Sequence, residues 1–174
     1  MKRYLSLVLA ALISLVFLGA CSKKPEAGGI ADRYLGDYSY DSSAVCMVYE
    51  PVEDEVNDEG KPYYGIQYRE IKDLDGLMHS GTTILIYFYS SMSTDTGAIT
   101  ASVEDVAQVY NGTMTVIMLD AMEYRELISK YDINAVPEFV LIKSGQEDKV
   151  FEAATYEHWS ISDVLSWLKS NGIS

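Results

Sequence analysis

Apolar runs and amphipathic segments follow one another along the chain with the lengths expected for strands and helices. Continuous apolar runs at residues 83–89 and 113–119 are typical of strands buried on both faces of a sheet. The whole pattern predicts strands at residues 44–49, 63–71, 83–89, 113–119, 139–142 and 149–152. It predicts helices at residues 72–79, 99–110, 123–131 and 161–168. This order predicts a three-layer α/β sandwich with a mixed central sheet.

Local signals refine the two ends of this pattern. Ser160 and Asp163 have the spacing of a capping box before the last helix, and Asn171-Gly172 is a typical helix stop. The strands at 44–49 and 63–71 predict an extra N-terminal strand or hairpin. Between them, the carboxylate-rich segment from Glu50 to Gly60 is predicted to be a solvated acidic loop.

The first twenty residues have the pattern of an export signal. Lys2 and Arg3 precede an apolar run at residues 4–20, which is short for a membrane-spanning helix and typical of a signal peptide. The run ends in Leu18-Gly19-Ala20-Cys21, which resembles the lipobox of bacterial lipoproteins, whose cysteine is lipidated and becomes the N-terminus. An uncleaved anchor or a simple secretory signal, with Cys21 incidental, is the alternative.

This interpretation gives four segments and a location. We predict a signal peptide at residues 1–20, a lipidated Cys21 with a flexible tether at 21–33, an N-terminal extension at 34–62 and the main domain at 63–174. The predicted location is the cell envelope, with the protein facing the periplasm or the exterior. Ser22 follows the cysteine, which by resemblance to lipoproteins of diderm bacteria favours the outer membrane.

The net charge of -13 restricts the partners that the chain can have. A strongly negative protein repels the phosphates of nucleic acids, so nucleic acid is not an expected partner. The same charge gives no attraction to anionic lipid. Attachment to a membrane is therefore expected to depend on the lipid at Cys21.

Three segments carry a resemblance to the thioredoxin family. The strand Ile84 to Tyr89 leads into Ser90-Ser91-Met92-Ser93-Thr94-Asp95-Thr96, where the family has WCxxC before a helix. Thr115 to Asp120 is similar to the family's third strand, and Tyr131-Asp132-Ile133-Asn134-Ala135-Val136-Pro137 is similar to its segment ending in a cis-proline. The resemblance covers residues 63–170 and implies a thioredoxin-like domain; whether the bond before Pro137 is cis stays open.

The residues that the family uses in catalysis differ here. By this resemblance, Met92, Ser93, Thr94, Asp95 and Thr96 mark a vestigial redox site, with Ser93 and Thr96 in place of the two cysteines. Tyr87 takes the place of the family's buried acid, and Met118 that of a nearby lysine. Disulfide exchange needs a thiolate, which a hydroxyl cannot replace. We therefore expect no catalytic residue at this site, and we expect Ser93, Asp95 or Thr96 to cap the following helix.

Without the catalytic residues, the resemblance still implies a binding surface. Val136 and Pro137 correspond to the loop that holds extended substrates in the family, and Met92 with Tyr89 would form an apolar wall beside it. The predicted function is a non-catalytic module that binds or assembles an envelope protein or peptide. No cofactor and no metal site are predicted, because His79 and His158 stand alone and no CxxC exists.

Two alternatives stay open. Cys46 is interpreted as a buried apolar residue, but it could also pair with another protein's cysteine or act as a lone redox thiol. In that case the chain would be a thiol-disulfide oxidoreductase or a redox-homeostasis protein that uses Cys46 or a partner's cysteines. The second alternative is an acidic cation-binding protein, based on the run Glu50 to Glu59, although the run lacks the spacing of an EF-hand.

Overall fold

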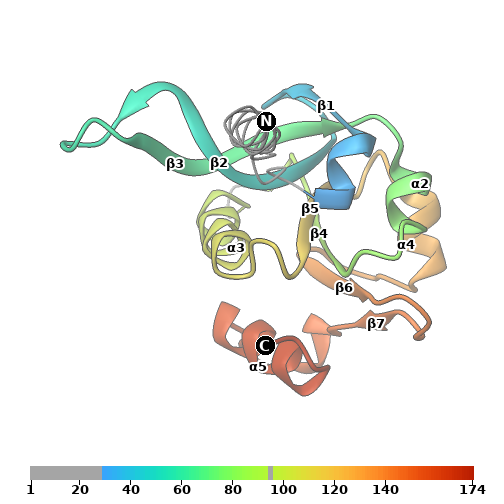
Figure 1. Ribbon diagram of the computed structural model, residues 1–174. Helices are drawn as coiled ribbons and strands as arrows, with labels where there is room; N and C mark the ends of the chain where they lie inside the picture. Colours follow the sequence, from blue (N-terminus) through green and yellow to red (C-terminus); the bar gives the residue numbers. More distant parts are fainter. Residues whose placement is uncertain (1–28, 94–95) are drawn as a thin grey trace, which may run out of the picture.

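The computed structural model describes residues 29–93 and 96–174. These residues form a seven-stranded sheet in the order β1-β3-β2-β5-β4-β6-β7 (Figure 1). The strands are β1 (Leu35–Tyr38), β2 (Ala44–Val56), β3 (Pro62–Ile71), β4 (Ile84–Tyr89), β5 (Thr115–Asp120), β6 (Glu138–Ile142) and β7 (Lys149–Val150). The helices are η1 (Gly29–Tyr34), α2 (Leu74–Met78), α3 (Thr96–Val109), α4 (Arg125–Lys130), η2 (Ala153–Thr155) and α5 (Ile161–Ser170), where η marks a 3₁₀-helix.

Side chains on the two faces of the central strands enter two separate cores. In β4, Leu85 and Tyr87 pack with α3 and α5, whereas Ile86 and Phe88 pack on the side of α2 and α4. Figure 1 shows α3 on one side of β4 and β5, and α2 and α4 on the other. Because β4 is covered on both faces, it is apolar at every position. The predicted three-layer α/β sandwich is confirmed.

The sheet is mixed, as its connections require. β4 and β5 are parallel and are joined through α3, whereas β6 runs antiparallel to β4 and continues into β7 through a short turn. At the other side of the sheet, β2 lies beside β5 and is antiparallel to it, from Ala44 opposite Leu119 to Met47 opposite Val116. β3 then pairs with β2, and β1 with β3.

The hairpin of β2 and β3 is longer than the sequence predicted. The strand expected to end at Tyr49 continues to Val56, so most of the predicted acidic loop is strand, and the turn spans only residues 57–61. β3 supplies a partner for each residue from Val45 to Pro51. Pro51 is tolerated because β2 has no second neighbouring strand beyond Met47.

The N-terminal end of the described chain is also more ordered than predicted. The sequence predicts a flexible tether at residues 21–33, but residues 29–33 belong to η1, and Ala31 is only 1% exposed. Asp32 forms an ion pair with Arg69 of β3, and the Arg69 Nε donates to the Gly36 carbonyl at 3.0 Å. Burial of Ala31 and these polar contacts fix η1 and the unpredicted strand β1 on the sheet.

The predicted boundary at residues 62 and 63 stays a prediction. It falls at the start of β3 and would separate two strands of one hairpin. The proposed signal peptide and Cys21 lie outside the described residues. Within the described part of the chain, no helix has the length and apolar character needed to cross a membrane.

Candidate functional site

A groove of about 550 Å³ opens where β4 ends and α3 begins. It is lined by three parts of the chain that are far apart in sequence. The first is the strand end and the start of α3, the second is the segment before β6, and the third is the segment before α5. The lining residues are Tyr87, Tyr89, Ser90, Ser93, Thr96, Ala98, Ile99, Ser102, Val136, Pro137, Trp159, Ser160 and Ile161.

The groove brings together four residues that the sequence singled out. Ser93 and Thr96, at the positions predicted for the two cysteines, line the same space as Val136 and Pro137. The Val136–Pro137 peptide bond is cis. Met92 is 81% exposed and does not line the groove, so the predicted apolar wall contains Tyr89 without it. Thr94 and Asp95 lie outside the described residues.

A compact turn shapes the strand end of the groove. The Ser90 carbonyl accepts from the Ser93 backbone N–H at 3.1 Å and from the Thr96 hydroxyl at 2.9 Å. The Ser90 hydroxyl accepts from the Met92 N–H at 3.2 Å. Thr96 is the first residue of α3, and its hydroxyl donates back to the turn. The two positions predicted for the cysteines, Ser93 and Thr96, therefore carry hydroxyls, and both residues are hydrogen-bonded to Ser90.

Tyr87 closes the inner end of the groove. It is fully buried and stacks on Phe139, with ring centroids 5.3 Å apart, and its hydroxyl lies 3.4 Å from the Thr100 Oγ1. Burial raises the pKa of the Tyr87 phenol, so the group stays neutral. Met118 is opposite Tyr87 in the β4–β5 ladder. The two residues that replace the family's acid and lysine are thus neighbours on adjacent strands.

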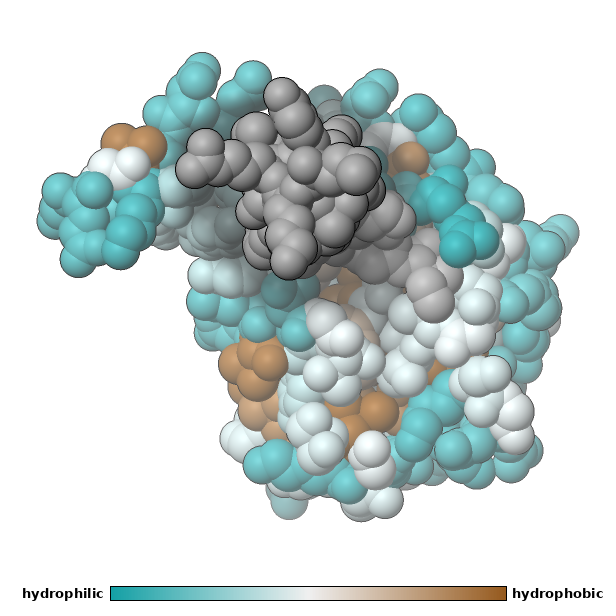
Figure 2. Space-filling view, in the orientation of Figure 1, coloured by the Kyte–Doolittle hydropathy of each residue, from teal (hydrophilic) through white to brown (hydrophobic). Residues whose placement is uncertain are grey.

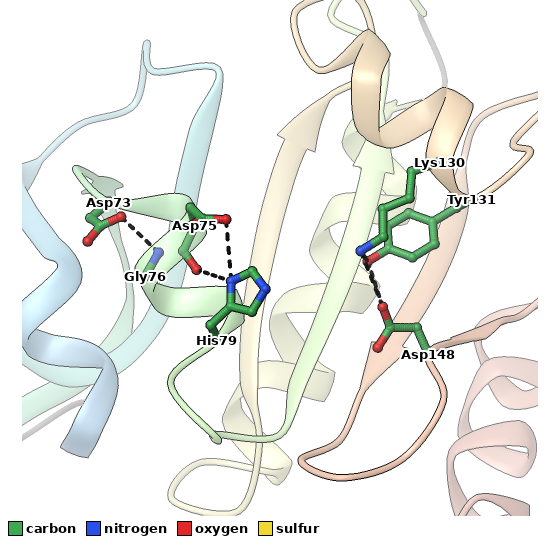
Figure 3. Close-up of polar contacts among 7 residues, drawn as sticks. All are labelled: Asp73, Asp75, Gly76, His79, Lys130, Tyr131 and Asp148. Atoms are coloured by element: carbon green, nitrogen blue, oxygen red, sulfur yellow. Dashed lines mark hydrogen bonds and ion pairs between the residues drawn. The ribbon is translucent and has the colours of Figure 1, made fainter.

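The segment that carries Val136 and Pro137 is fixed at its start by a polar cluster. The Tyr131 hydroxyl donates to the Asp148 carboxylate at 3.0 Å and accepts from the Lys130 ammonium at 3.0 Å (Figure 3). Lys130 is also 3.5 Å from Asp148. These contacts join the end of α4 to the loop before β7. They hold one end of the segment that reaches the groove.

A buried carboxylate fixes the other end of this segment. Glu138, 6% exposed, follows Pro137, and its two oxygens accept from the backbone N–H groups of Phe139 and Ala153, each at 2.9 Å. Burial raises the pKa of Glu138, and these backbone hydrogen bonds oppose the shift. Glu138 therefore links β6 to η2. It also borders a second cavity of about 420 Å³ on the other side of Pro137.

Trp159 forms the wall between the two cavities and was not predicted. It lines both of them together with Val136 and Pro137. Its ring meets Phe139 and Phe151 edge-on, with centroids 5.6 and 5.9 Å apart. A signal existed in the sequence: Trp159 directly precedes the N-cap Ser160. An apolar residue at that position commonly packs against the helix that follows.

The predicted capping box fixes the helix behind Trp159. The Asp163 carboxylate accepts from both the N–H and the hydroxyl of Ser160, each at 2.8 Å, and the structure confirms the box. Val164 and Leu168 then anchor α5 in the same core as Phe139. The wall of the groove is thus attached to the sheet by packing and by a defined helix start.

Cys46 belongs to the core on the opposite face of the sheet from the groove. It is 1% exposed and packs in the core on the side of α2 and α4, whereas the groove borders the core on the side of α3 and α5. Desolvation raises the pKa of the Cys46 thiol to about 12. The interpretation of Cys46 as a buried apolar residue is confirmed.

Two acidic residues near α2 serve local structure. Asp73 is the N-cap of α2 and accepts from the Gly76 N–H at 2.8 Å, and Asp75 lies 3.3 Å from the His79 Nδ1 (Figure 3). In the described ranges, no group of three or more histidine, cysteine or acidic side chains is placed to hold a metal ion. The groove therefore offers hydroxyls, apolar rings and backbone groups.

The sequence model of the family described as Thioredoxin matches residues 72–166. The chloroplastic thioredoxin Y2 of Arabidopsis thaliana is 29% identical over 80 residues, which are 46% of this chain and 48% of that protein. The chloroplastic thioredoxin Y1 of the same plant is 26% identical over 95 residues, 55% of each chain. The chain thus spans about half the length of these relatives.

A solved thioredoxin structure is also similar to this chain. Deadhead, a germline-specific thioredoxin of Drosophila melanogaster, has 16% identity and a TM-score of 0.44, covering 52% of this chain and 81% of that chain. The match of the family model extends over more than half of the chain, from α2 into α5. On that match, with the groove between β4, α3 and the cis-proline segment, the chain belongs to the thioredoxin family.

Proposed function

We propose that this protein is a membrane-anchored lipoprotein whose thioredoxin-like domain binds a protein or peptide in the cell envelope without catalysing disulfide exchange. The observation that carries the proposal is the pair Ser93 and Thr96 in the groove beside Val136 and Pro137. Hydroxyls at these positions cannot form the mixed disulfide on which thiol exchange depends. The walls for holding a ligand are nevertheless present.

The groove has the composition of a peptide-binding site. Tyr89, Ile99, Trp159 and Ile161 provide apolar surface, while Ser93 and Ser160 provide polar groups at the rim. Rigid aromatic walls with a few polar groups are typical of sites that bind a side chain and orient it. An extended peptide could add main-chain hydrogen bonds along the Val136–Pro137 segment. We infer that the ligand is an extended peptide with an apolar side chain seated against Trp159.

The oxidoreductase alternative has less support. It would use Cys46, whose thiol is buried and has a pKa of about 12, so the thiolate that must attack a disulfide is scarce at neutral pH. A substrate would also have to reach the core. Cysteines supplied by a partner protein are a separate form of this alternative.

Site-specific photocrosslinking in native membranes tests the binding function. A photoreactive amino acid at Ser93 should capture an envelope protein, whereas the same group at exposed Ser129 of α4 should not. Adding Trp159→Ala to the Ser93 variant should reduce the captured product at least about threefold. Equal capture from Ser93 and Ser129, or no effect of Trp159→Ala, would contradict a binding role of the groove.

An insulin-reduction assay tests the absence of catalysis. The purified protein should reduce insulin no faster than buffer alone. Turnover that survives in Cys46→Ser would contradict the proposal directly. Turnover that is lost in Cys46→Ser would instead establish the oxidoreductase alternative.

The lipid anchor needs its own test. Mass spectrometry of the mature N-terminus should find residues 1–20 absent and fatty acyl chains on Cys21. Cys21→Ser should release the protein from the membrane fraction. A Cys21→Ser protein that stays in the membrane fraction would show that the apolar run, and not lipid, attaches it.

A further inference from the structure

The hairpin of β2 and β3 extends beyond the sheet as a two-stranded arm, here defined as residues 48–67. β5 pairs with β2 only as far as Met47, and β1 pairs with β3 only at Arg69 and Ile71. In the described chain, both outer edges of the arm are therefore without a neighbouring strand. Figure 1 shows it projecting away from the rest of the domain. The backbone groups along these edges are available to another chain.

The arm buries little of its own surface. From Glu53 to Tyr64 every residue is exposed, including the apolar or aromatic side chains of Val56, Tyr63 and Tyr64 at 65%, 51% and 48%. Two-stranded ribbons are only marginally stable in water without a covering layer. Exposed aromatic side chains on such a ribbon are typical of a surface that a partner covers.

The charge of the arm indicates what kind of partner fits. Figure 2 shows its far end as mostly hydrophilic surface. Lys61 is its one basic residue, and it pairs with Glu59 at 2.7 Å. The acidic residues are Glu50, Glu53, Asp54, Glu55, Asp58 and Glu59. A second copy of this chain would bring like charges together across the new ladder, which disfavours it.

A buried carboxylate at the base of the arm points to the same partner. Glu50 is 6% exposed, and its Oε1 has no hydrogen-bond partner, the only such case among the buried side-chain oxygens and nitrogens of the described residues. The Tyr38 hydroxyl hydrogen-bonds the Glu50 carboxylate, but the neighbour of Glu50 across the ladder is Gly65, which has no side chain to meet Oε1. A buried carboxylate oxygen left without a donor is costly, and a basic group would satisfy it.

We propose that the arm binds a lysine- or arginine-rich segment of a partner protein, which adds to one edge of the arm as a strand and places a basic side chain against Glu50. The carboxylates of the arm select the basic partner, and the exposed rings of Tyr63 and Tyr64 contact its side-chain stems and cationic groups. This surface is separate from the groove, so the inference does not depend on the function proposed for the groove.

Binding of synthetic peptides to the full-length protein tests the inference. The probe is a fluorescent peptide of alternating lysine and valine, measured by anisotropy at low and high salt. The same peptide with a methyl group on every backbone nitrogen has the same charge but cannot donate the hydrogen bonds of a strand. The lysine–valine peptide should bind at least about tenfold more tightly, and its affinity should fall with salt. Equal affinity of the two peptides would overturn strand addition.

Matched variants distinguish an effect of the charges on the arm from an effect of the net charge of the protein. Glu53→Gln, Asp54→Asn and Glu55→Gln together should weaken binding about tenfold, because three exposed charge pairs are lost. The control removes three exposed carboxylates elsewhere, with Asp105→Asn, Glu123→Gln and Glu126→Gln, and should change the affinity less than about twofold. Equal weakening in the two triple variants would overturn the inference.

Amide hydrogen exchange on the unaltered protein gives a test that needs no substitution. The lysine–valine peptide should slow exchange at residues 48–67 and leave the segment around Val136 unchanged. Protection confined to the groove, or to no part of the arm, would overturn the proposal even if the arm variants fail to fold.

Discussion

At the scale of single residues, burial decides what the one described cysteine can do. The pKa of the Cys46 thiol is raised from 9.0 to about 12. This lowers the thiolate fraction at pH 8 about a thousandfold, since each pKa unit changes it tenfold. We expect alkylation of Cys46 by iodoacetamide to be at least about a hundredfold slower in the folded protein than in guanidinium. Peptide mass spectrometry reads Cys46 separately from Cys21. Fast labelling in the folded state would contradict this burial.

Glu138 gives a pH-dependent prediction at the same scale. Gln at this position has one acceptor oxygen for two backbone N–H groups, so Glu138→Gln should destabilise the domain by about 1–3 kcal/mol at pH 7. Burial raises the folded-state pKa of Glu138 above its value of 4.5 in the unfolded chain. The folded state then binds the proton more tightly, and the wild type gains stability as the pH falls through the raised pKa towards 4.5.

The destabilisation by Glu138→Gln should therefore increase on acidification from pH 7 to pH 4.5. Urea unfolding at several pH values measures it. Glu126→Gln, which changes an exposed carboxylate, is the control and should stay within about 0.5 kcal/mol. A difference that shrinks on acidification would mean that the pKa of Glu138 is lowered in the folded state.

At the scale of elements, the sequence predicted whether a segment is a strand or a helix better than it predicted where that segment begins and ends. Strands buried on both faces, such as β4, were predicted because a strand that is covered on both sides is a continuous apolar run. β1 was missed because it has four residues and pairs with β3 over a short stretch. β2 was predicted too short, because its acidic second half resembles a loop until β3 supplies its hydrogen bonds. Pairing between strands depends on the tertiary structure, so the local pattern of residues does not reveal it.

The last helix shows how packing, rather than intrinsic propensity, stabilises a short element. α5 has ten residues, too few for a stable isolated helix in water. Leu168 is fully buried in the core that it shares with Phe139, so Leu168→Ala should cost about 2–5 kcal/mol. Lys169→Ala, one residue on and exposed, should cost less than about 0.5 kcal/mol. Thermal unfolding of both variants checks this, and equal effects would contradict the packing described here.

At the scale of the whole molecule, the groove assembles residues from three parts of the chain. The family resemblance placed Ser93, Thr96, Val136 and Pro137 in one site, and the structure brings them together. It did not find Trp159, because the segment before α5 has no motif in common with the family. Val136 and Pro137 belong to a segment that the family shares, whereas the wall that contains Trp159 arises only when distant segments of the chain pack together.

The placement of the vestigial site can be tested by restoring its thiols. In a Cys46→Ser background, Ser93→Cys with Thr96→Cys should form a disulfide under mild oxidant, because both positions border one groove at the start of α3. The Ser93 N–H and the Thr96 hydroxyl both donate to the Ser90 carbonyl, at 3.1 and 2.9 Å, so the two residues lie close together, as a disulfide with Cα atoms usually about 4.4–6.8 Å apart requires. Thiol titration and mass spectrometry measure the bond. Free thiols in a folded protein would mean that the site is placed incorrectly.

The burial of Cys46 on the face of the sheet opposite the groove makes this thiol an internal reporter for the whole domain. A reagent reaches it when the core opens, so its labelling rate follows the population of opened molecules. A ligand that binds the folded state at a hundred times its Kd lowers that population about a hundredfold. Screening envelope extracts or peptide pools for slower labelling of Cys46 would therefore detect ligands of the groove and of the arm, without any assumption about their chemistry.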